Sequence, residues 1–308
     1  MKVGFVGLGT MGASMAMNVI RGGHELVVHD IRRESATQHL EAGAQWADTP
    51  RQVAERSEIV LTSLPGPLEV EAVALGEDGL TEGLSEGKIY LDLSTSSPAL
   101  IRDIHAKFAE RGIHVLDAPV SGDPEGARTR KLAVWVGGDR EVFERCMPVL
   151  NAIGDKPYYV GTIGAGTVAK LAHNCIGYII QTGMAEVFTM GVKAGVDPLA
   201  LWLAVRQGAQ GRRGVFERLP DHFLTGDYDP PDFALRLARK DIDLAVQLGR
   251  ENDVPMRLAA LSLQDIIEGL NRGWGDLDSR SAMMLQEERA GVKVRATKEA
   301  IREALENE

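Results

Sequence analysis

Apolar and polar residues follow two different patterns along this chain of 308 residues. In the first half, short apolar runs typical of buried strands alternate with amphipathic stretches typical of helices. Strands are expected at residues 3–6, 26–29, 59–63, 89–93, around 115 and 132–136, and helices at residues 11–21, 99–111 and 140–150. Strands that alternate with helices predict βαβ units and a mostly parallel sheet.

In the second half, helical patterns dominate. Residues 167–194 form one long apolar run with few breakers and recurring small residues, which predicts a buried central helix. Further helices are expected at residues 198–206, 234–251 and 255–270. Residues 208–231, rich in Gly and Pro, are expected to form an irregular loop near the functional site.

A glycine-rich turn joins the first expected strand to the first expected helix. Gly7, Gly9 and Gly12 have the spacing of a dinucleotide-binding fingerprint, in which they allow a tight turn, approach of the backbone to the pyrophosphate, and packing of helix on strand. The second strand ends at Asp30, about twenty residues further on, where such sites place the acid that binds the ribose. Strand, turn, helix, strand and acid together predict a nucleotide cofactor.

The residues around Asp30 bear on which dinucleotide binds. A carboxylate at this position favours NAD because it would repel a 2′-phosphate. Arg32 and Arg33 follow directly, either as surface residues at a helix start or as partners for a 2′-phosphate. We therefore expect NAD and leave NADP open.

These patterns predict an α/β fold with three parts. Residues 1–163 should form a dinucleotide-binding domain with a Rossmann-type, doubly wound sheet. Residues 164–292 should form an all-α domain for substrate binding and oligomerisation, built on the long central helix. Residues 293–308 should form a charged helical tail.

Composition narrows the class of protein. The net charge of −10 and the pI of about 5.3 argue against a nucleic-acid-binding protein. No signal-peptide pattern and no apolar run of transmembrane length is found, so we expect no membrane partner. Cys146 and Cys175 form no Cys-x-x-Cys motif and no His–carboxylate cluster has ligand spacing, so we expect a cytoplasmic protein without a metal.

Two polar residues in the long apolar run are candidates for chemistry. Lys170 and Asn174 are four residues apart and therefore share one face of the helix. A lysine in an apolar helix must be paired, extend to the surface, or be used. His173 is expected on another face, without a direct role.

Five ordered motifs extend along the chain. They are Gly7-Leu-Gly-Thr-Met-Gly12, Asp92-Leu-Ser-Thr-Ser-Ser-Pro98, Asp117-Ala-Pro-Val-Ser-Gly122, Gly161 through Lys170 to Asn174, and Lys240-Asp-Ile-Asp-Leu-Ala245. With them the chain resembles, over residues 2–290, the 3-hydroxyisobutyrate dehydrogenase family, also called the β-hydroxyacid dehydrogenases. The resemblance implies an NAD(P)-dependent oxidoreductase that acts on CH–OH groups.

The resemblance also implies roles for single residues. Lys170 matches the catalytic lysine of the family, and Asn174 matches a residue that helps to fix the substrate. Ser121 and Gly122 match the loop that binds the substrate carboxylate. Lys240 matches a lysine that contacts cofactor or substrate at the cleft.

Further positions match the cofactor site. Ser94 and Thr95 match residues at the nicotinamide ribose and ring, although a Ser-Thr-Ser-Ser run before Pro98 also suits a helix-capping loop. Phe233 fits an aromatic position near the nicotinamide. The expected cofactor-binding residues are Gly7, Leu8, Gly9, Thr10, Met11, Gly12, Asp30, Leu64, Pro65, Thr95, Phe233 and Lys240.

The carboxylate loop departs from the family pattern. After Ser121-Gly122 come Asp123 and Pro124 where a second glycine is usual. Asp123 adds a negative charge beside an anion site, and Pro124 removes a backbone donor. The second functional group of the substrate is therefore expected to differ from that of simple 3-hydroxyacids. Arg212 and Arg213 are either extra anion contacts or solvated loop charges.

The expected reaction is oxidation of a small, anionic 3-hydroxy carboxylic acid, or reduction of the matching semialdehyde, with Lys170 as general base or acid. One alternative is an NADPH-dependent semialdehyde, ketone or imine reductase on the same scaffold, against which Lys170 argues. Another is a non-catalytic cofactor-binding protein, against which Lys170 and Asn174 argue. The partners expected besides the substrate are further copies of the chain, in a homodimer or homotetramer.

Overall fold

The chain forms two compact units, Met1–Ile176 and Gly177–Glu308. The computed structural model describes residues 1–197, 201, 204, 205, 207–212, 214, 218–251, 253–291 and 293–306. No helix in these described ranges is long and apolar enough to cross a membrane.

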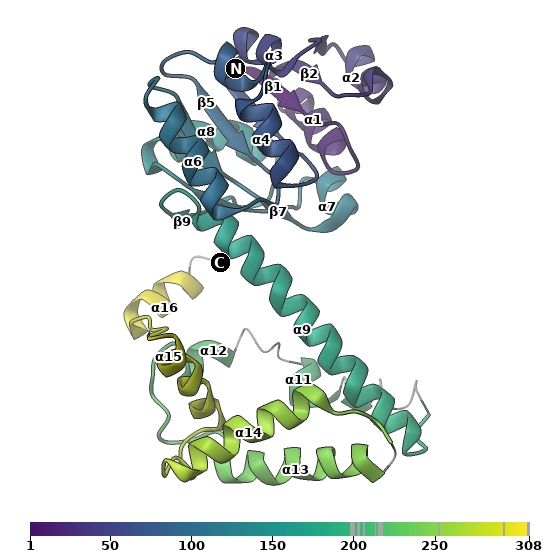
Figure 1. Ribbon diagram of the computed structural model, residues 1–308, viewed down its shortest axis with the longest axis vertical. Helices are drawn as coiled ribbons and strands as arrows, with labels where there is room; N and C mark the ends of the chain where they lie inside the picture. The colour runs from purple at the N-terminus through teal and green to yellow at the C-terminus, as the bar shows by residue number, and fades with distance from the viewer. Residues whose placement is uncertain are drawn as a thin grey trace. The chain divides into compact units, whose positions relative to one another are not determined.

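A nine-stranded sheet forms the centre of the first unit (Figure 1). Its strands are β1 (Lys2–Val6), β2 (Glu25–His29), β3 (Gln45–Trp46), β4 (Ile59–Thr62), β5 (Ile89–Asp92), β6 (His114–Asp117), β7 (Val120–Ser121), β8 (Ala133–Gly137) and β9 (Tyr158–Gly161). The order is β3-β2-β1-β4-β5-β6-β8-β7, with β9 beside β8. The strands from β3 to β6 pair in parallel, and β8 runs antiparallel to β6 and β7. The order reverses between β2 and β4 on the two sides of β1, which confirms the doubly wound sheet.

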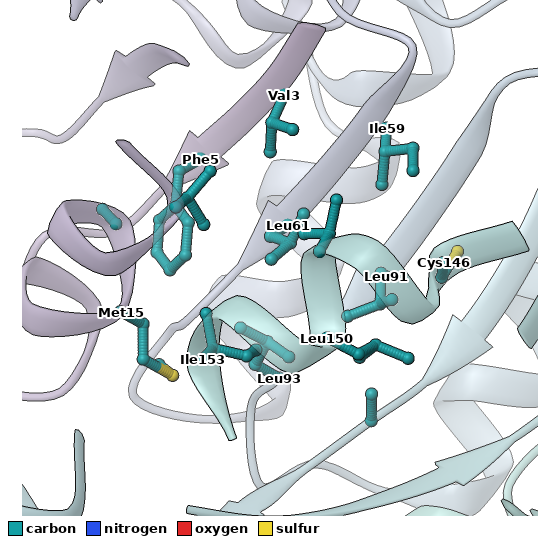
Figure 2. Close-up of a cluster of buried hydrophobic side chains, with 14 of the residues drawn as sticks. Val3, Phe5, Met15, Ile59, Leu61, Leu91, Leu93, Cys146, Leu150 and Ile153 are labelled. Atoms are coloured by element: carbon teal, nitrogen blue, oxygen red, sulfur yellow. The ribbon is translucent and has the colours of Figure 1, made fainter. Parts of the chain in front are cut away.

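Helices cover both faces of this sheet (Figure 1). The helices of the first unit that precede the long helix are α1 (Gly12–Arg21), η1 (Arg33–Ala36), α2 (Thr37–Glu41), α3 (Pro50–Arg56), α4 (Pro67–Leu75), α5 (Leu80–Gly83), α6 (Pro98–Ala109), α7 (Asp123–Thr129) and α8 (Arg140–Ile153). On one face, Phe5 and Leu61 pack with Met15 of α1 and Leu150 of α8 (Figure 2). On the other face, apolar side chains of α3, α4 and α6 pack against alternate residues such as Val60. Burial on both faces explains why the strands read as continuous apolar runs.

Three strands lie outside the sequence prediction. β3 and β7 have two residues each, which is too short for any alternation to show. β9 pairs with β8 and has the burial pattern of a half-exposed strand, and its apolar run, residues 158–160, is only three residues long.

The second unit contains helices and no strand among its described residues, which confirms the predicted all-α part. The long helix α9 (Ala165–Lys193) begins in the first unit and continues into the second. The helices that follow are α11 (Ala209–Arg212), α12 (Leu219–His222), α13 (Leu235–Glu251), α14 (Arg257–Asn271), η3 (Ser279–Met283), α15 (Met284–Ala290) and α16 (Lys298–Glu306). Residues 208–231 are thus not wholly irregular, because α11 and α12 fall within them.

The prediction that α9 is buried is wrong for the single chain. Its apolar side chains at Leu171, Ile180 and Met184 are 41%, 37% and 50% exposed. An apolar run indicates that a helix is covered, but it does not tell whether the cover comes from the same chain or from another.

Candidate active site

The turn between β1 and α1 depends on two glycines. Gly7 has φ +96°, and a Cβ there would overlap the carbonyl oxygen of Ser63. A Cβ on Gly12 would overlap the carbonyl oxygen of Gly7. A Cβ on Gly9 would meet no atom within 4 Å. Gly7 and Gly12 are therefore required by packing, and Gly9 leaves the backbone open to a ligand.

Asp30 follows the last residue of β2 at the same sheet edge. Its Oδ2 accepts the backbone N–H of Leu8 at 2.7 Å, and its Oδ1 accepts the N–H of Arg32 at 2.9 Å. These bonds fix the carboxylate and leave lone pairs for further donors such as ribose hydroxyls. Leu8 is buried and contributes through its backbone.

A cavity of about 510 Å³ lies against this turn. Its lining residues are Val6, Gly7, Gly9, Thr10, Met11, Gly12, His29, Asp30, Ile31, Arg32, Ser63, Leu64, Pro65, Glu69, Ala72 and Val73. Eight predicted cofactor-binding residues thus line one cavity, with backbone N–H groups at the start of α1 and a fixed carboxylate. These groups suit the phosphates and the ribose of a dinucleotide.

The two arginines after Asp30 differ in their surroundings. Arg32 lines the cavity. The guanidinium of Arg33 lies over the ring of Trp46, 5.1 Å from its centroid, and 3.8 Å from Asp48. Arg33 is therefore engaged elsewhere on the surface.

A second cavity, of about 310 Å³, adjoins the first and shares Met11, Ser63 and Leu64 with it. Its lining residues are Met11, Ser63, Leu64, Leu93, Ser94, Thr95, Val120, Ser121, Gly122 and Lys170. It brings the predicted catalytic lysine together with Thr95 and with the predicted substrate loop.

Lys170 supplies the one titratable side chain among the described residues that line this second cavity. Partial burial lowers the pKa of its ammonium group, because desolvation disfavours the charged form. A lowered pKa makes a lysine a better candidate for proton exchange, because less free energy is needed to remove its proton. Asn174 follows one turn later on α9 and is half-buried.

Ser94 fastens two loops together beside this cavity. Its Oγ accepts the N–H of Leu64 at 2.9 Å, and its own N–H donates to Oδ1 of Asp92 at 3.1 Å. The same Oδ1 accepts the hydroxyl of Thr62 at 2.7 Å. The alternative of helix capping does not apply, because Ser97, the residue at the start of α6, makes no side-chain cap bond.

His173 makes a contact that the sequence analysis did not expect. Its Nε2 lies 3.1 Å from Oγ of Ser121, and its ring lies against that of Trp135 with centroids 5.1 Å apart. His173 follows Lys170 by three residues, and residues three apart also share a helix face, so the expectation of another face does not hold, whereas the absence of a direct role stays a prediction. That spacing was the signal available in the sequence.

Both parts of the chain match sequence models of known protein families. Residues 2–161 match the sequence model of the NAD binding domain of 6-phosphogluconate dehydrogenase, and residues 164–286 match that described as NAD-binding of NADP-dependent 3-hydroxyisobutyrate dehydrogenase. The chain is 32% identical over 293 residues to 2-(hydroxymethyl)glutarate dehydrogenase of Eubacterium barkeri, which covers 95% of this chain and 97% of that protein. It is 35% identical over 269 residues to 3-hydroxyisobutyrate dehydrogenase of Pseudomonas aeruginosa, which covers 84% of this chain and 89% of that protein.

The chain belongs to the 3-hydroxyisobutyrate dehydrogenase, or β-hydroxyacid dehydrogenase, family. Membership confirms the resemblance predicted from the five motifs. It also confirms the predicted class, an NAD(P)-dependent oxidoreductase, because the first unit matches an NAD-binding domain.

Solved structures agree with this membership. A 3-hydroxyisobutyrate dehydrogenase of Mycobacterium tuberculosis, described with L-serine, superposes with a TM-score of 0.64 at 26% identity over 92% of this chain and 98% of that one. An imine reductase from Myxococcus stipitatus, described in complex with NAD⁺, superposes with a TM-score of 0.78 at 23% identity over 92% of this chain and 98% of that one. The second likeness shows a shared fold.

The predicted substrate loop turns directly into a helix. Gly122 has φ +139°, and α7 begins at Asp123 with Pro124 in its first turn. Proline is well placed there, because the first N–H groups of a helix have no partner within it. The side chain of Asp123 lies outside the described part of the structure.

The remaining predicted residues lie in or next to the second unit's helices. Phe233 precedes α13, is 41% exposed, and donates its N–H to Asp278 at 3.2 Å. Lys240 lies on α13 and Arg212 ends α11, but both side chains are outside the described part. Arg213 is outside the described residues altogether.

Among the described residues, one group could offer three ligand atoms to a metal: His222, Asp232 and Asp278, within 4.8 Å of one another. The guanidinium of Arg280 lies 3.0 Å from Asp278 and 3.7 Å from Asp232, and that of Arg218 lies 3.8 Å from Asp232. These two cations already balance the two carboxylates. We therefore describe the group as an ion-pair network.

Proposed function

We propose that this protein oxidises a small 3-hydroxy carboxylic acid with NAD, or reduces the matching semialdehyde. One observation carries the proposal: Lys170, with its lowered pKa, lines a cavity that adjoins the dinucleotide cavity and contains Ser121 and Gly122. The relatives named 3-hydroxyisobutyrate dehydrogenase and 2-(hydroxymethyl)glutarate dehydrogenase support this substrate class.

Lys170, Ser121 and Gly122 have separate roles in this reaction. The glycine-rich turn at Gly9 and the carboxylate of Asp30 would hold the dinucleotide, which would supply the hydride acceptor for oxidation of the carbon that bears the hydroxyl. Nζ of Lys170 takes the hydroxyl proton in oxidation and returns it in reduction, so that a carbonyl group forms or disappears. Ser121 can donate its hydroxyl hydrogen, and Gly122 its N–H, to the substrate carboxylate. Asn174, Lys240 and Phe233 remain proposed as further contacts.

Asp30 supports a preference for NAD. Its carboxylate is fixed in the first cavity by two backbone N–H groups, and Arg33 is engaged by Trp46 and Asp48. Arg32 lines the cavity as the remaining cation beside Asp30, so NADP is expected to bind more weakly rather than not at all. Steady-state kinetics with both cofactors measure the ratio.

The decisive experiment replaces the lysine. We expect Lys170→Ala to lower kcat by about 10²- to 10⁴-fold, the usual contribution of general acid–base catalysis. The Kd for NAD, from quenching of protein fluorescence, should stay within about twofold, because Lys170 does not line the first cavity. The substrate panel is 3-hydroxyisobutyrate, L-serine, glycerate and 4-hydroxybutyrate. Full turnover by a folded Lys170→Ala protein would refute the assignment.

The arrangement of the protein is also part of the proposal. We assign nucleotide binding to residues 1–163, substrate binding and oligomerisation to 164–292, and a helical tail to 293–308. The exposed apolar side chains of α9 support a homodimer or homotetramer. Cys146 is a buried thiol, and burial raises its pKa to about 12, which fits an inert cysteine in a reducing cytoplasm.

A further inference from the structure

Asp117, the last residue of β6, is 1% exposed and binds the beginning of α9. Its Oδ1 accepts the N–H of Gly164 at 2.7 Å. Its Oδ2 accepts the N–H of Thr167 at 2.6 Å and the hydroxyl of Thr167 at 2.8 Å. Three donors thus converge on one buried carboxylate, which satisfies orphan N–H groups of the first helical turn.

The packing around this carboxylate leaves no space. A Cβ on Gly137 of β8 would overlap Oδ1 of Asp117. A Cβ on Gly166 would lie 3.1 Å from Oδ2 and 2.7 Å from the carbonyl oxygen of Asp117, and would overlap the carbonyl oxygen of Trp135. Two glycines on different elements are therefore needed for the carboxylate to reach the helix.

Asp117 and Thr167, which are joined by these hydrogen bonds, are each close in sequence to residues that line the second cavity. On one side, the chain runs from Asp117 through three residues to Ser121 and Gly122. On the other side, Lys170 follows Thr167 by three residues, so it lies one turn from the anchored turn of α9. Loop and helix belong to distant parts of the sequence, and the carboxylate joins them directly.

We propose that Asp117 is the positioning residue that holds Lys170 in register with the substrate loop. The inference rests on the proposed function of Lys170. Asp117 touches neither cavity, so it acts through the first turn of α9. A lysine that shifts by about 1 Å loses a large part of its rate contribution, because proton transfer requires hydrogen-bond geometry.

The test compares Asp117→Asn with wild type. An amide keeps the shape of the carboxylate but places an NH₂ group against backbone donors. We expect kcat to fall by about 10- to 100-fold, with the Kd for NAD within about twofold of wild type, because the β1–α1 turn is untouched. The pH profile of kcat/KM should also change: the pKa assigned to Lys170 should rise as the lysine becomes more solvated. A merely structural role would lower the melting temperature and leave that pKa in place.

A second pair of variants covers the case in which Asp117→Asn does not fold. Thr167→Val removes the hydroxyl donor at nearly constant volume, and Thr167→Ser restores it. We expect Thr167→Val to lower kcat several-fold and to raise the kinetic pKa, and Thr167→Ser to be close to wild type.

The outcomes separate this inference from the proposed function. If Lys170→Ala is inactive while Asp117→Asn and Thr167→Val keep wild-type kcat and kinetic pKa, the positioning role is wrong and the proposed function stands. If Lys170→Ala is fully active, the proposed function fails first. Loss of NAD binding in Asp117→Asn would show a general disturbance of the first unit and would overturn the positioning role.

Discussion

At the scale of single residues, buried carboxyl groups at the end of the sheet hold the loops of the site. Asp92 and Asp117 end neighbouring parallel strands and are partners in register. Asp92 is 1% exposed, and burial raises its pKa to about 6, against the hydrogen bonds from Ser94 and Thr62 that favour the ionised form. Its Oδ2 has no hydrogen-bond partner within the part of the chain that the structure describes. Asp92 thus holds Ser94 in place, but burial of its ionised carboxylate lowers the free energy of unfolding.

That cost predicts a pH dependence of folding. The carboxyl is ionised in the unfolded chain above about pH 4, but in the folded protein only above about pH 6. Between these values the folded state binds more protons than the unfolded chain, so the contribution of Asp92 to the free energy of unfolding falls as the pH rises. From about 1.4 kcal/mol per pKa unit, wild type should lose on the order of 2 kcal/mol between pH 4.5 and 7.5 through this group.

Urea unfolding of wild type and Asp92→Asn at both pH values measures this contribution. The stability of Asp92→Asn relative to wild type should be greater at pH 7.5 than at pH 4.5. An equal difference at the two pH values would show that Asp92 ionises normally in the folded protein.

At the scale of elements, the turn from β1 to α1 combines two requirements that mutations can separate. Gly12 is needed for the fold, because a Cβ there would overlap the carbonyl oxygen of Gly7. Gly9 borders the first cavity, where a Cβ would meet no protein atom within 4 Å. The same motif therefore contains one glycine needed for packing and one needed for a ligand.

We expect Gly12→Ala to lower the melting temperature by several degrees, the scale of about 1–2 kcal/mol in a protein of this size. Gly9→Ala should melt within about 2 °C of wild type and yet raise the Kd for NAD by about tenfold or more, since each 1.4 kcal/mol is a factor of ten. Calorimetry and fluorescence titration give the two readouts. If the two variants had the same melting temperature and the same Kd for NAD, the separate roles of Gly12 and Gly9 would be contradicted.

The elements also show what the sequence could predict. Apolar runs of four or more residues, such as that in β8, and the fingerprint at Gly7 were predictable, because an apolar run and a glycine-rich turn are local properties of the sequence. The two-residue strand β7 was not, since its pairing depends on β8. The contact of His173 with Ser121, and the anchoring of α9 by Asp117, join residues about fifty positions apart. A local pattern can place His173 on the helix face of Lys170, but it does not show which distant residue a side chain meets.

At the scale of the whole molecule, the described part of α9 carries a row of exposed apolar side chains. Ile176, Ile180, Met184 and Val187 share one side of α9 and are each at least 37% exposed in the single chain. Exposed apolar side chains at helical spacing are consistent with the proposed contact to another protein chain. A second copy of the chain is the partner that the proposed oligomer requires.

Met184→Glu should therefore weaken assembly, because a buried unpaired charge is costly in an interface. Light scattering coupled to gel filtration should give a multiple of 33.3 kDa for wild type and a lower mass for the variant at equal concentration. Leu68→Glu, at a 77% exposed position of α4, is the matched control and should keep the wild-type mass. A wild-type mass of 33.3 kDa would refute the oligomer.

The continuity of α9 has a practical consequence for anyone who tries to divide this protein. The boundary between the two compact units falls between Ile176 and Gly177, inside a helix, so the units share no loop that a protease could cut first. A fragment that ends at Ile176 would keep Lys170 on a stub of about three turns. The register of that stub would then rest on Asp117 and on the contacts of His173 with Ser121 and Trp135, and the fragment would be expected to bind nucleotide better than it performs chemistry.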